Sequence, residues 1–232
     1  MIPKIIHQTW KTKDIPDQFQ AASASWRKLH PDWEYRLWSH DDLDAFVEAE
    51  FPQIWPLYKS YPEDIQRVDA ARYMFLYRYG GLYSDLDIAC NRPMDDFLDH
   101  EALMAPTKPV GLANDLMMAE PGHPFFKACI DSLGTSFARF NRFFILRHFR
   151  VLMTTGPLFV TRVHKDSVHR DRIFLMPGIH YNSGDKEQAY VLHLPGDTWA
   201  EWDTHMLNFL ANNWKVFVSL GTALILGLLF LL

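Results

Sequence analysis

The pattern of apolar and polar positions divides the first part of the chain into three elements. The run KIIHQTW is short, apolar and β-branched, which predicts a first strand. The next stretch predicts an amphipathic helix that ends before Pro31, and its apolar face consists of Phe19, Ala22, Trp26 and Leu29. WEYRLW then alternates and predicts a second strand. Strand, helix and strand form a βαβ unit, so we expect an α/β fold whose ligands bind at the carboxyl ends of parallel strands.

The tripeptide DLD occurs twice, and the first copy lies in SHDDLDAF. Ser39 or Asp41 is expected to cap a helix there, with acidic residues in its first turn. On a helix, Asp42 and Asp44 lie about 200° apart and cannot face one ion. This copy is predicted to be a capping sequence.

The second copy follows a long helix predicted over DIQRVDAARYMFLYRY, with Gly80 expected as its left-handed cap. LYSDLDIAC suits a buried strand, and in extended backbone Asp85 and Asp87 project to the same side. Two carboxylates on one face raise each other's pKa unless a cation lies between them, and such oxygen ligands suit Mn²⁺ or Mg²⁺. A strand-end turn with solvated carboxylates is the alternative.

The end of the chain is strongly apolar. It closes with VFVSLGTALILGLLFLL, seventeen residues without a charge, which as a helix would be about 25 Å long. We expect residues 215–232 to be a transmembrane or membrane-anchoring helix, either a tail anchor or the first of several spans, and residues 201–214 to be an interfacial amphipathic helix. A buried core helix is the alternative. The apolar run at the start is too short for a signal peptide.

Composition and charge limit the classes of partner that we expect for this protein. Hydrophobic content of 48% and charged content of 22% are ordinary for one domain, which we place at residues 1–200. The net charge of −5, without a long basic run, argues against nucleic acid as a partner. Cys90 and Cys129 lack metal-binding spacing, and their pairing stays open. ARFNRFFILRHFRVLM mixes arginine with phenylalanine and predicts either a helix on an anionic membrane surface or a core helix with solvated arginines.

Several stretches together resemble the nucleotide-sugar glycosyltransferases of family 32. They are IPKIIHQTW, RVDAARYMFLYRYGGLYSDLD, and ANDLMMAEPGHPFF followed by TTGPLF. Within that family the chain is most similar to the mannosyltransferases that make mannosyl inositol phosphorylceramide, over residues 2 to about 200. The resemblance implies a GT-A fold, which is a Rossmann-like mixed sheet flanked by helices. It also implies a metal-binding Asp-x-Asp, a sugar-nucleotide donor and retention of anomeric configuration.

The resemblance also implies the roles of individual residues in the chemistry. Asp85 and Asp87 would hold the metal, with His193 of YVLHLPGDTW as a further ligand. A metal there would stabilise the charge that builds on the departing diphosphate. Asn114 and Asp115 match the pair near the reacting anomeric carbon, where a carboxylate acts as nucleophile or as electrostatic stabiliser. Apart from the resemblance, a core histidine and a turn aspartate are the alternatives for His193 and Asp115.

The residues expected to bind the donor are Gln8, Thr9, Trp10, Asp69, Arg72, Tyr73, Gly80, Gly81 and Trp199. Asp69 and Arg72 lie three apart on one helix face and match the pair that holds the donor sugar and its phosphates. Arginine suits this role because its planar fork binds oxygen ligands in fixed geometry. An intrahelical surface pair is the alternative for these two, and core packing is the alternative for Trp10.

We therefore expect a membrane-anchored, retaining glycosyltransferase that depends on Mn²⁺ or Mg²⁺. GDP-mannose is the expected donor and an inositol phosphoceramide-type lipid the expected acceptor, at the Golgi or another endomembrane of a eukaryote. The alternative is a family 32 transferase that uses UDP-galactose, UDP-glucose or UDP-N-acetylglucosamine on a lipid or polysaccharide acceptor, because no residue decides the sugar. The rivals from other classes are an Asp-x-Asp phosphohydrolase and an inactive binding module. A regulatory subunit, a homo-oligomer and the side of the membrane that the site faces stay open.

Overall fold

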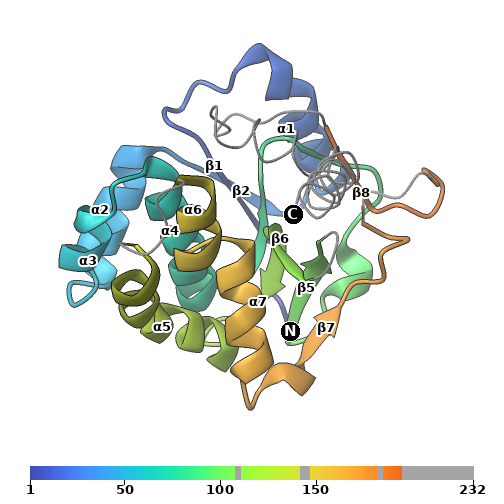
Figure 1. The fold of residues 1–232 in the computed structure, drawn as a ribbon. Helices are drawn as coiled ribbons and strands as arrows, with labels where there is room; N and C mark the ends of the chain where they lie inside the picture. Colours follow the sequence, from blue (N-terminus) through green and yellow to red (C-terminus); the bar gives the residue numbers. More distant parts are fainter. Residues whose placement is uncertain (108–110, 142–146, 182–184, 195–232) are drawn as a thin grey trace, which may run out of the picture.

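The structure is a computed structural model that describes residues 1–107, 111–141, 147–181 and 185–194 (Figure 1). In chain order its elements are β1 (Ile5–Thr9), α1 (Asp17–Leu29), β2 (Glu34–Trp38), α2 (His40–Glu50), α3 (Trp55–Ser60), α4 (Asp64–Tyr79), β3 (Gly81–Ser84), β4 (Ile88–Cys90), the 3-10 helix η1 (Asp95–Phe97), β5 (Ala102–Pro106), β6 (Leu112–Ala119), α5 (Pro124–Phe140), α6 (Arg147–Thr154), α7 (Pro157–Asp166), the 3-10 helix η2 (Arg170–Arg172), β7 (Ile173–Leu175) and β8 (Val191–His193). The strand, helix and strand predicted at the start are confirmed as β1, α1 and β2.

A six-stranded mixed sheet, in the order β2-β1-β3-β6-β5-β7, forms the centre of the fold. β1 pairs in parallel with both β2 and β3, as the βαβ pattern predicts, whereas β6 runs antiparallel to β3 and β5. β4 and β8 form a separate antiparallel sheet. A mixed, Rossmann-like sheet is therefore confirmed.

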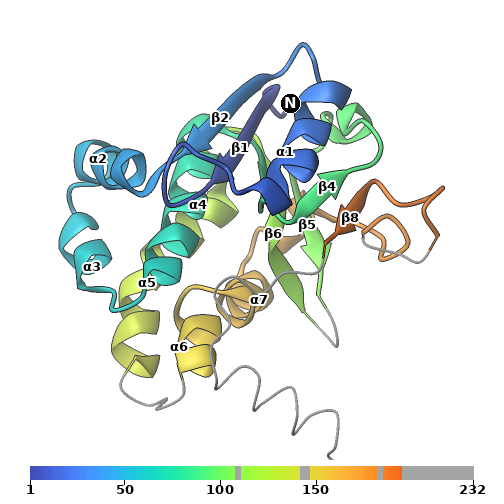
Figure 2. The same cartoon turned by 90° about the horizontal axis from the view of Figure 1, so that it is seen from above.

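Helices cover both faces of the central sheet. Figure 2 shows α1 on the side of β4, with α2 to α7 gathered on the other side. Alternate residues of a strand supply the two cores, because successive side chains point to opposite faces. In β6, Met117 and Ala119 belong to the core under α4, α5 and α7, whereas Leu116 and Met118 belong to the core that includes Trp26 of α1.

The first DLD copy lies on α2 and caps it, as predicted. Ser39 is the N-cap, and its hydroxyl accepts a hydrogen bond from the amide of Asp42 at 3.2 Å. The Asp42 carboxylate accepts one from the Ser39 amide at 2.7 Å, which completes a capping box. Asp44 instead pairs with Lys59 at 2.7 Å. The two carboxylates of this copy thus have separate structural partners.

The second DLD copy does not lie on a continuous strand, and that prediction was wrong. β3 ends at Ser84, and the chain turns so that the Ile88 amide donates to the carbonyl of Asp85 at 3.2 Å. β4 then leaves the central sheet and pairs with β8. This exchange of partners breaks the strand. Asp85 and Asp87 therefore lie on a turn at the carboxyl end of β3.

Gly80 and Gly81 join α4 to β3 with φ of 67° and 93°. Gly80 has the positive φ expected of a cap, but its ψ of −156° lies outside the left-handed helical region. A Cβ on Gly81 would lie 2.5 Å from the carbonyl oxygen of Ile5, and one on Gly80 would lie 2.8 Å from that of Ala119. Both glycines allow close backbone packing at the amino end of β3, and their contact with the donor stays a prediction.

The predictions for the end of the chain lie outside the described residues. They concern Trp199, the interfacial helix at 201–214 and the membrane helix at 215–232. Among the helices that the structure describes, none is long and apolar enough to cross a membrane. Of the stretch rich in arginine and phenylalanine, residues 138–140 end α5 and residues 147–153 belong to α6, whereas residues 142–146 lie outside the described residues.

Candidate active site

A pocket of about 750 Å³ lies where β1 and β3 end. Of the predicted site residues, it is lined by Thr9, Trp10, Asp69, Arg72, Asp85, Asp87, Asn114, Asp115 and His193. Gln8, Tyr73, Gly80 and Gly81 are not part of its lining. The carboxyl ends of the parallel strands thus carry the candidate site, as expected for this type of sheet.

Arg72 is the centre of an ion cluster in the wall of this pocket. Its Nη2 lies 3.1 Å from Oδ1 of Asp69 and 3.4 Å from Oδ1 of Asp85, and its Nη1 donates to the carbonyl of Asn114 at 2.6 Å. The guanidinium also lies over the ring of Tyr83, 4.4 Å from its centroid. Burial lowers the pKa of Arg72, but the charges of Asp85 and its other neighbours raise this pKa by a larger amount. The guanidinium therefore stays a cation. Asp69 and Arg72 are 4% and 2% exposed, which rules out a surface pair.

Asp69 is held on both of its oxygens. Its Oδ1 accepts a hydrogen bond from the side-chain Nδ2 of Asn114 at 3.0 Å, and its Oδ2 accepts one from the hydroxyl of Thr155 at 3.0 Å. Tyr73 donates to the carbonyl of Thr155 at 2.6 Å, so it supports this arrangement from outside the pocket. Burial raises the pKa of Asp69, and the Arg72 charge and these hydrogen bonds oppose the rise. We did not predict a role for Thr155, although it lies in the TTGPLF stretch that carries part of the resemblance.

Three carboxylates come together beside this cluster. Burial raises the pKa of Asp85 to about 7; the charge of Arg72 opposes this rise, and those of Asp87 and Asp115 add to it. Burial likewise raises the pKa of Asp115. The Oδ1 atoms of Asp87 and Asp115 and the Nε of Arg72 are buried and have no hydrogen-bond partner among the described residues. Buried polar atoms of this kind require a partner, so the pocket is prepared for a polar ligand.

His193 lies on β8, directly opposite Ile88 of β4. Its Nε2 is 3.3 Å from Oδ2 of Asp87, and this contact is the main reason why the pKa of His193 rises to about 9. His193 is therefore an imidazolium at neutral pH. In the described part of the chain, no group of three His, Cys, Asp or Glu side chains is arranged to hold a metal. His193 contacts Asp87 directly, and its role as a third metal ligand beside Asp85 and Asp87 stays a prediction.

Gln8 holds the turn rather than lining the pocket. It is fully buried, and its amide nitrogen donates to the backbone carbonyl of Asp85 at 3.3 Å. Its Oε1 accepts from the hydroxyl of Tyr35 at 2.8 Å, and Tyr35 in turn meets the hydroxyl of Ser23 at 2.8 Å. Gln8 therefore positions Asp85 from behind the pocket, and its contact with the donor stays a prediction.

Thr9 and Trp10 continue β1 into the pocket. The Thr9 hydroxyl lies 3.2 Å from that of Tyr83, which itself donates to Oδ1 of Asp85. Trp10 packs edge-on against Phe19 of α1, with their ring centroids 5.7 Å apart, and both rings line the pocket. Thr9 therefore helps to position the acidic turn, and Trp10 contributes an apolar wall.

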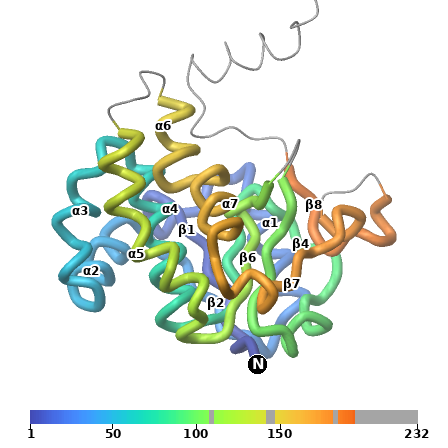
Figure 3. The backbone as a smooth tube through the Cα atoms, turned by 60° about the horizontal axis from the view of Figure 1, so that its bottom comes forward, coloured from blue at the N-terminus to red at the C-terminus, as the bar shows by residue number. Residues whose placement is uncertain are grey.

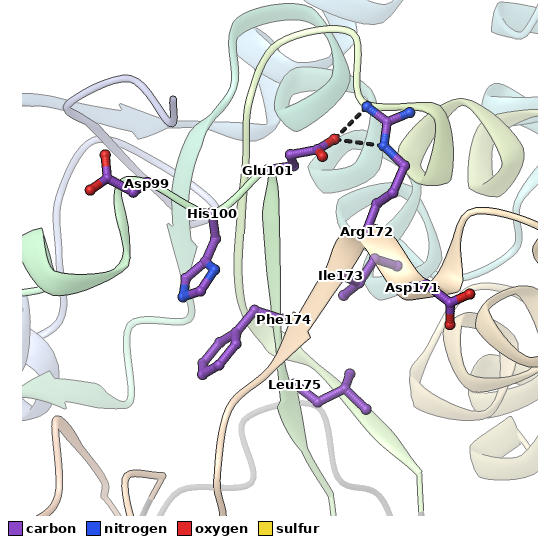
Figure 4. A pocket seen from close by; sticks show the side chains of 8 residues that line it. All are labelled: Asp99, His100, Glu101, Asp171, Arg172, Ile173, Phe174 and Leu175. Atoms are coloured by element: carbon purple, nitrogen blue, oxygen red, sulfur yellow. Dashed lines mark hydrogen bonds and ion pairs between the residues drawn. The ribbon is translucent and has the colours of Figure 1, made fainter.

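A second depression, of about 390 Å³, lies beside β5 and β7 (Figure 4). Glu101 and Arg172 form an ion pair across it, and the ring of His100 stacks on that of Phe174 with centroids 4.1 Å apart. None of the predicted site residues lines it. We therefore assign the chemistry to the first pocket.

The fold and the acidic turn define a DXD-containing glycosyltransferase. A family profile described as "Glycosyltransferase sugar-binding region containing DXD motif" matches residues 16–104. Inositol phosphoceramide mannosyltransferase 1 of Schizosaccharomyces pombe is 33% identical over 236 residues, which cover 99% of this chain and 72% of that protein. Inositol phosphoceramide mannosyltransferase 3 of the same yeast is 36% identical over 227 residues, or 95% of this chain and 62% of that protein. The chain belongs to the DXD glycosyltransferase family that includes these enzymes.

Other comparisons agree on the fold and show that some relatives are longer. Mannosyl phosphorylinositol ceramide synthase CSH1 of Saccharomyces cerevisiae is 41% identical over 165 residues, which cover 71% of this chain but only 43% of that protein. The PaToxG glycosyltransferase has 19% identity and a TM-score of 0.53, over 72% of this chain and 70% of that chain. The glycosyltransferase domain of the YGT toxin has 10% identity and a TM-score of 0.50, over 75% and 80%. These two similarities show a glycosyltransferase fold of the GT-A type.

The residues present fit a divalent cation, on which DXD-containing GT-A glycosyltransferases generally depend. Asp85 and Asp87 are hard oxygen donors that repel each other, and Oδ1 of Asp87 has no hydrogen-bond partner among the described residues. Asp85 and Asp87 would hold the ion. The imidazolium of His193 is positive, as the cation would be, and its contact with Asp87 places positive charge beside the two carboxylates.

Proposed function

We propose that this protein transfers mannose from GDP-mannose to an inositol phosphoceramide-type lipid, with retention of configuration and with the help of Mn²⁺ or Mg²⁺. The names of its relatives support the sugar and the acceptor. The observation that carries the proposal is the convergence of the Asp69–Arg72 pair and the Asp85–Asp87 turn in one pocket. Attachment to an endomembrane through the C-terminal segment is part of the proposal.

The Asp69–Arg72 pair supplies what a sugar needs for binding. Sugar hydroxyls both donate and accept hydrogen bonds, and the pair offers carboxylate acceptors beside guanidinium donors. Because Arg72 is fixed by Asp69, Asp85 and the carbonyl of Asn114, it can bind a donor without losing further side-chain freedom. Its charge also favours the phosphates of a nucleotide sugar.

The acidic turn serves the departure of the diphosphate. Asp85 and Asp87 would hold a divalent cation, which would neutralise the negative charge that grows on the leaving phosphate oxygen. The imidazolium of His193 and the guanidinium of Arg72 contribute positive charge on the same side of the pocket. The Oδ1 of Asp115 is assigned to stabilising positive charge at the anomeric carbon.

The test uses the full-length chain in detergent or bilayers, with labelled GDP-mannose, Mn²⁺ and an inositol phosphoceramide. We expect Asp87→Ala to abolish transfer while the free energy of unfolding stays close to that of the wild type. Asp44→Ala is the matched control, because it changes the same tripeptide in the copy on α2, where Asp44 pairs with Lys59 and does not line the pocket. Transfer only from UDP sugars would overturn the donor, and release of phosphate from phosphomonoesters without sugar transfer would favour a phosphohydrolase.

A further inference from the structure

The pocket extends beyond the sugar-binding pair along α4. Its wall there is formed by α4, α6 and the start of α7, through Ile65, Val68, Val151, Leu152 and Pro157. Arg147, the first residue of α6, also lines this part. Figure 3 shows α6 packed beside α4 and α5. We call these six residues the α6 wall, which combines an apolar surface with one guanidinium.

The α6 wall is fixed to the beginning of α4. The Nε of Arg147 donates to Oε2 of Glu63 at 2.8 Å, and Arg150, one turn further along α6, donates to the other oxygen of Glu63. Gln66 donates to the hydroxyl of Thr154 at 2.7 Å, which ties the end of α6 to the same helix. Arg147 is therefore oriented before any ligand arrives.

The position of Arg147 separates it from the diphosphate. Glu63, which holds Arg147, precedes Arg72 by nine residues, or about 13 Å along the helix axis. Arg72 contacts Asp85 at the turn expected to hold the cation and the diphosphate. Arg147 and Arg72 are thus held at different points along α4, and we infer that an anion bound by Arg147 is a second anion, distinct from the diphosphate. In addition, the carboxylate of Glu63 accepts from both Arg147 and Arg150.

We propose that the α6 wall is the acceptor subsite, in which Arg147 binds the phosphodiester of an amphiphilic acceptor and the apolar residues contact its hydrocarbon part. This inference rests on the proposed function. The acceptor has a phosphate between the polyol that receives the sugar and its apolar body. With the polyol at the reacting carbon, the phosphate and the apolar part extend away from the cation site, which is where the α6 wall lies. Arginine suits a phosphate because its fork binds two oxygens.

Arg150 provides a matched control within the same ion pair. Both arginines bind Glu63, but only Arg147 lines the pocket. We expect Arg147→Ala to raise the KM for the lipid acceptor roughly ten-fold or more, the size expected for a lost charge-assisted hydrogen bond. The KM for GDP-mannose and the slow hydrolysis of the donor without acceptor should stay within about two-fold of the wild type. Arg150→Ala should leave all three quantities within that range.

A second experiment tests whether Arg147 binds the phosphate of the acceptor's headgroup, independently of the hydrocarbon part of the lipid. Soluble inositol phosphate should inhibit the wild type and inhibit Arg147→Ala much less, if the guanidinium binds the phosphate itself. Inhibition that is equal in both proteins would overturn the role of Arg147. Equal effects of Arg147→Ala and Arg150→Ala on the acceptor KM would show that only the Glu63 contact matters, and a raised KM for GDP-mannose would assign Arg147 to the donor. Normal wild-type transfer in these cases leaves the proposed function intact, whereas absence of wild-type transfer overturns both.

Discussion

The hydroxyl of Tyr181 donates a hydrogen bond to Oδ2 of Asp115 at 2.5 Å, across 66 positions of the chain. The other oxygen of Asp115 is buried and has no partner among the described residues. Burial and the charge of Asp115 raise the pKa of Tyr181 far above its usual range, so the phenol stays protonated and remains a donor. Tyr181 therefore fixes the rotation of the carboxylate and is a positioning residue.

The first prediction concerns Tyr181→Phe, which removes only the hydroxyl. We expect kcat for sugar transfer to fall roughly ten-fold or more, because a hydrogen bond to a charged group is lost, while the KM for the donor changes little. Tyr190→Phe is the control. Tyr190 lies in the same segment and makes the same kind of bond, at 2.5 Å, to Asp96, and neither residue lines the pocket. Steady-state kinetics measures both constants. An equal loss of kcat in Tyr181→Phe and Tyr190→Phe would refute the positioning role of Tyr181.

The contact of Tyr181 also differs from the features that can be predicted from the sequence. The capping role of the first DLD, the βαβ unit and the shared face of Asp69 and Arg72 follow from spacing along the chain, and the structure confirms them. The contact between Tyr181 and Asp115 joins residues with no local pattern in common, so sequence alone does not predict it.

The break between β3 and β4 has a similar origin. LYSDLDIAC is apolar on both sides of its two aspartates, which is typical of one strand. The turn forms because Ile88, Ala89 and Cys90 pair with β8 near the end of the described chain instead of with β6. Asp85 and Asp87 both line the pocket, although the backbone that brings them together is a turn.

His7 of β1 links the sheet to the start of β3 through both of its ring nitrogens. Nε1 of Trp38 donates to Nδ1 at 3.1 Å, so Nδ1 is an acceptor. Nε2 therefore carries the proton and donates to the carbonyl of Gly80 at 2.9 Å. Burial lowers the pKa of His7 to about 3, and the imidazole stays neutral in the folded protein.

The second prediction follows from this lowered pKa. The unfolded chain binds a proton at His7 below its ordinary pKa of 6.5, whereas the folded protein does not until the pH approaches about 3. The contribution to stability is complete above pH 6.5 and declines as the pH falls, by about 2 kcal/mol between pH 6.5 and pH 5. His7→Gln keeps a donor and an acceptor but does not titrate. Urea unfolding at both pH values should show this extra decline in the wild type only, and identical declines would contradict it.

The third prediction separates backbone strain from steric contact at glycine. Gly81 and Gly122 both have positive φ, 93° and 73°, but their surroundings differ. A Cβ on Gly81 would lie 2.5 Å from the carbonyl of Ile5 in the neighbouring strand, whereas one on Gly122 would meet nothing within 4 Å. We expect Gly122→Ala to lower the free energy of unfolding by about 1–2 kcal/mol, from strain alone.

Gly81→Ala adds a clash with backbone atoms that cannot rotate away, so its cost should be larger, about 3 kcal/mol or more. Because β3 leads directly into Asp85, displacement of the strand should also reduce sugar transfer in the protein that remains folded. Chemical unfolding gives the first quantity, and the rate per folded molecule gives the second. Equal destabilisation by the two substitutions would mean that β1 and β3 can move apart at Ile5 without cost. In that case the close contact at Gly81 would not help to hold the acidic turn in place.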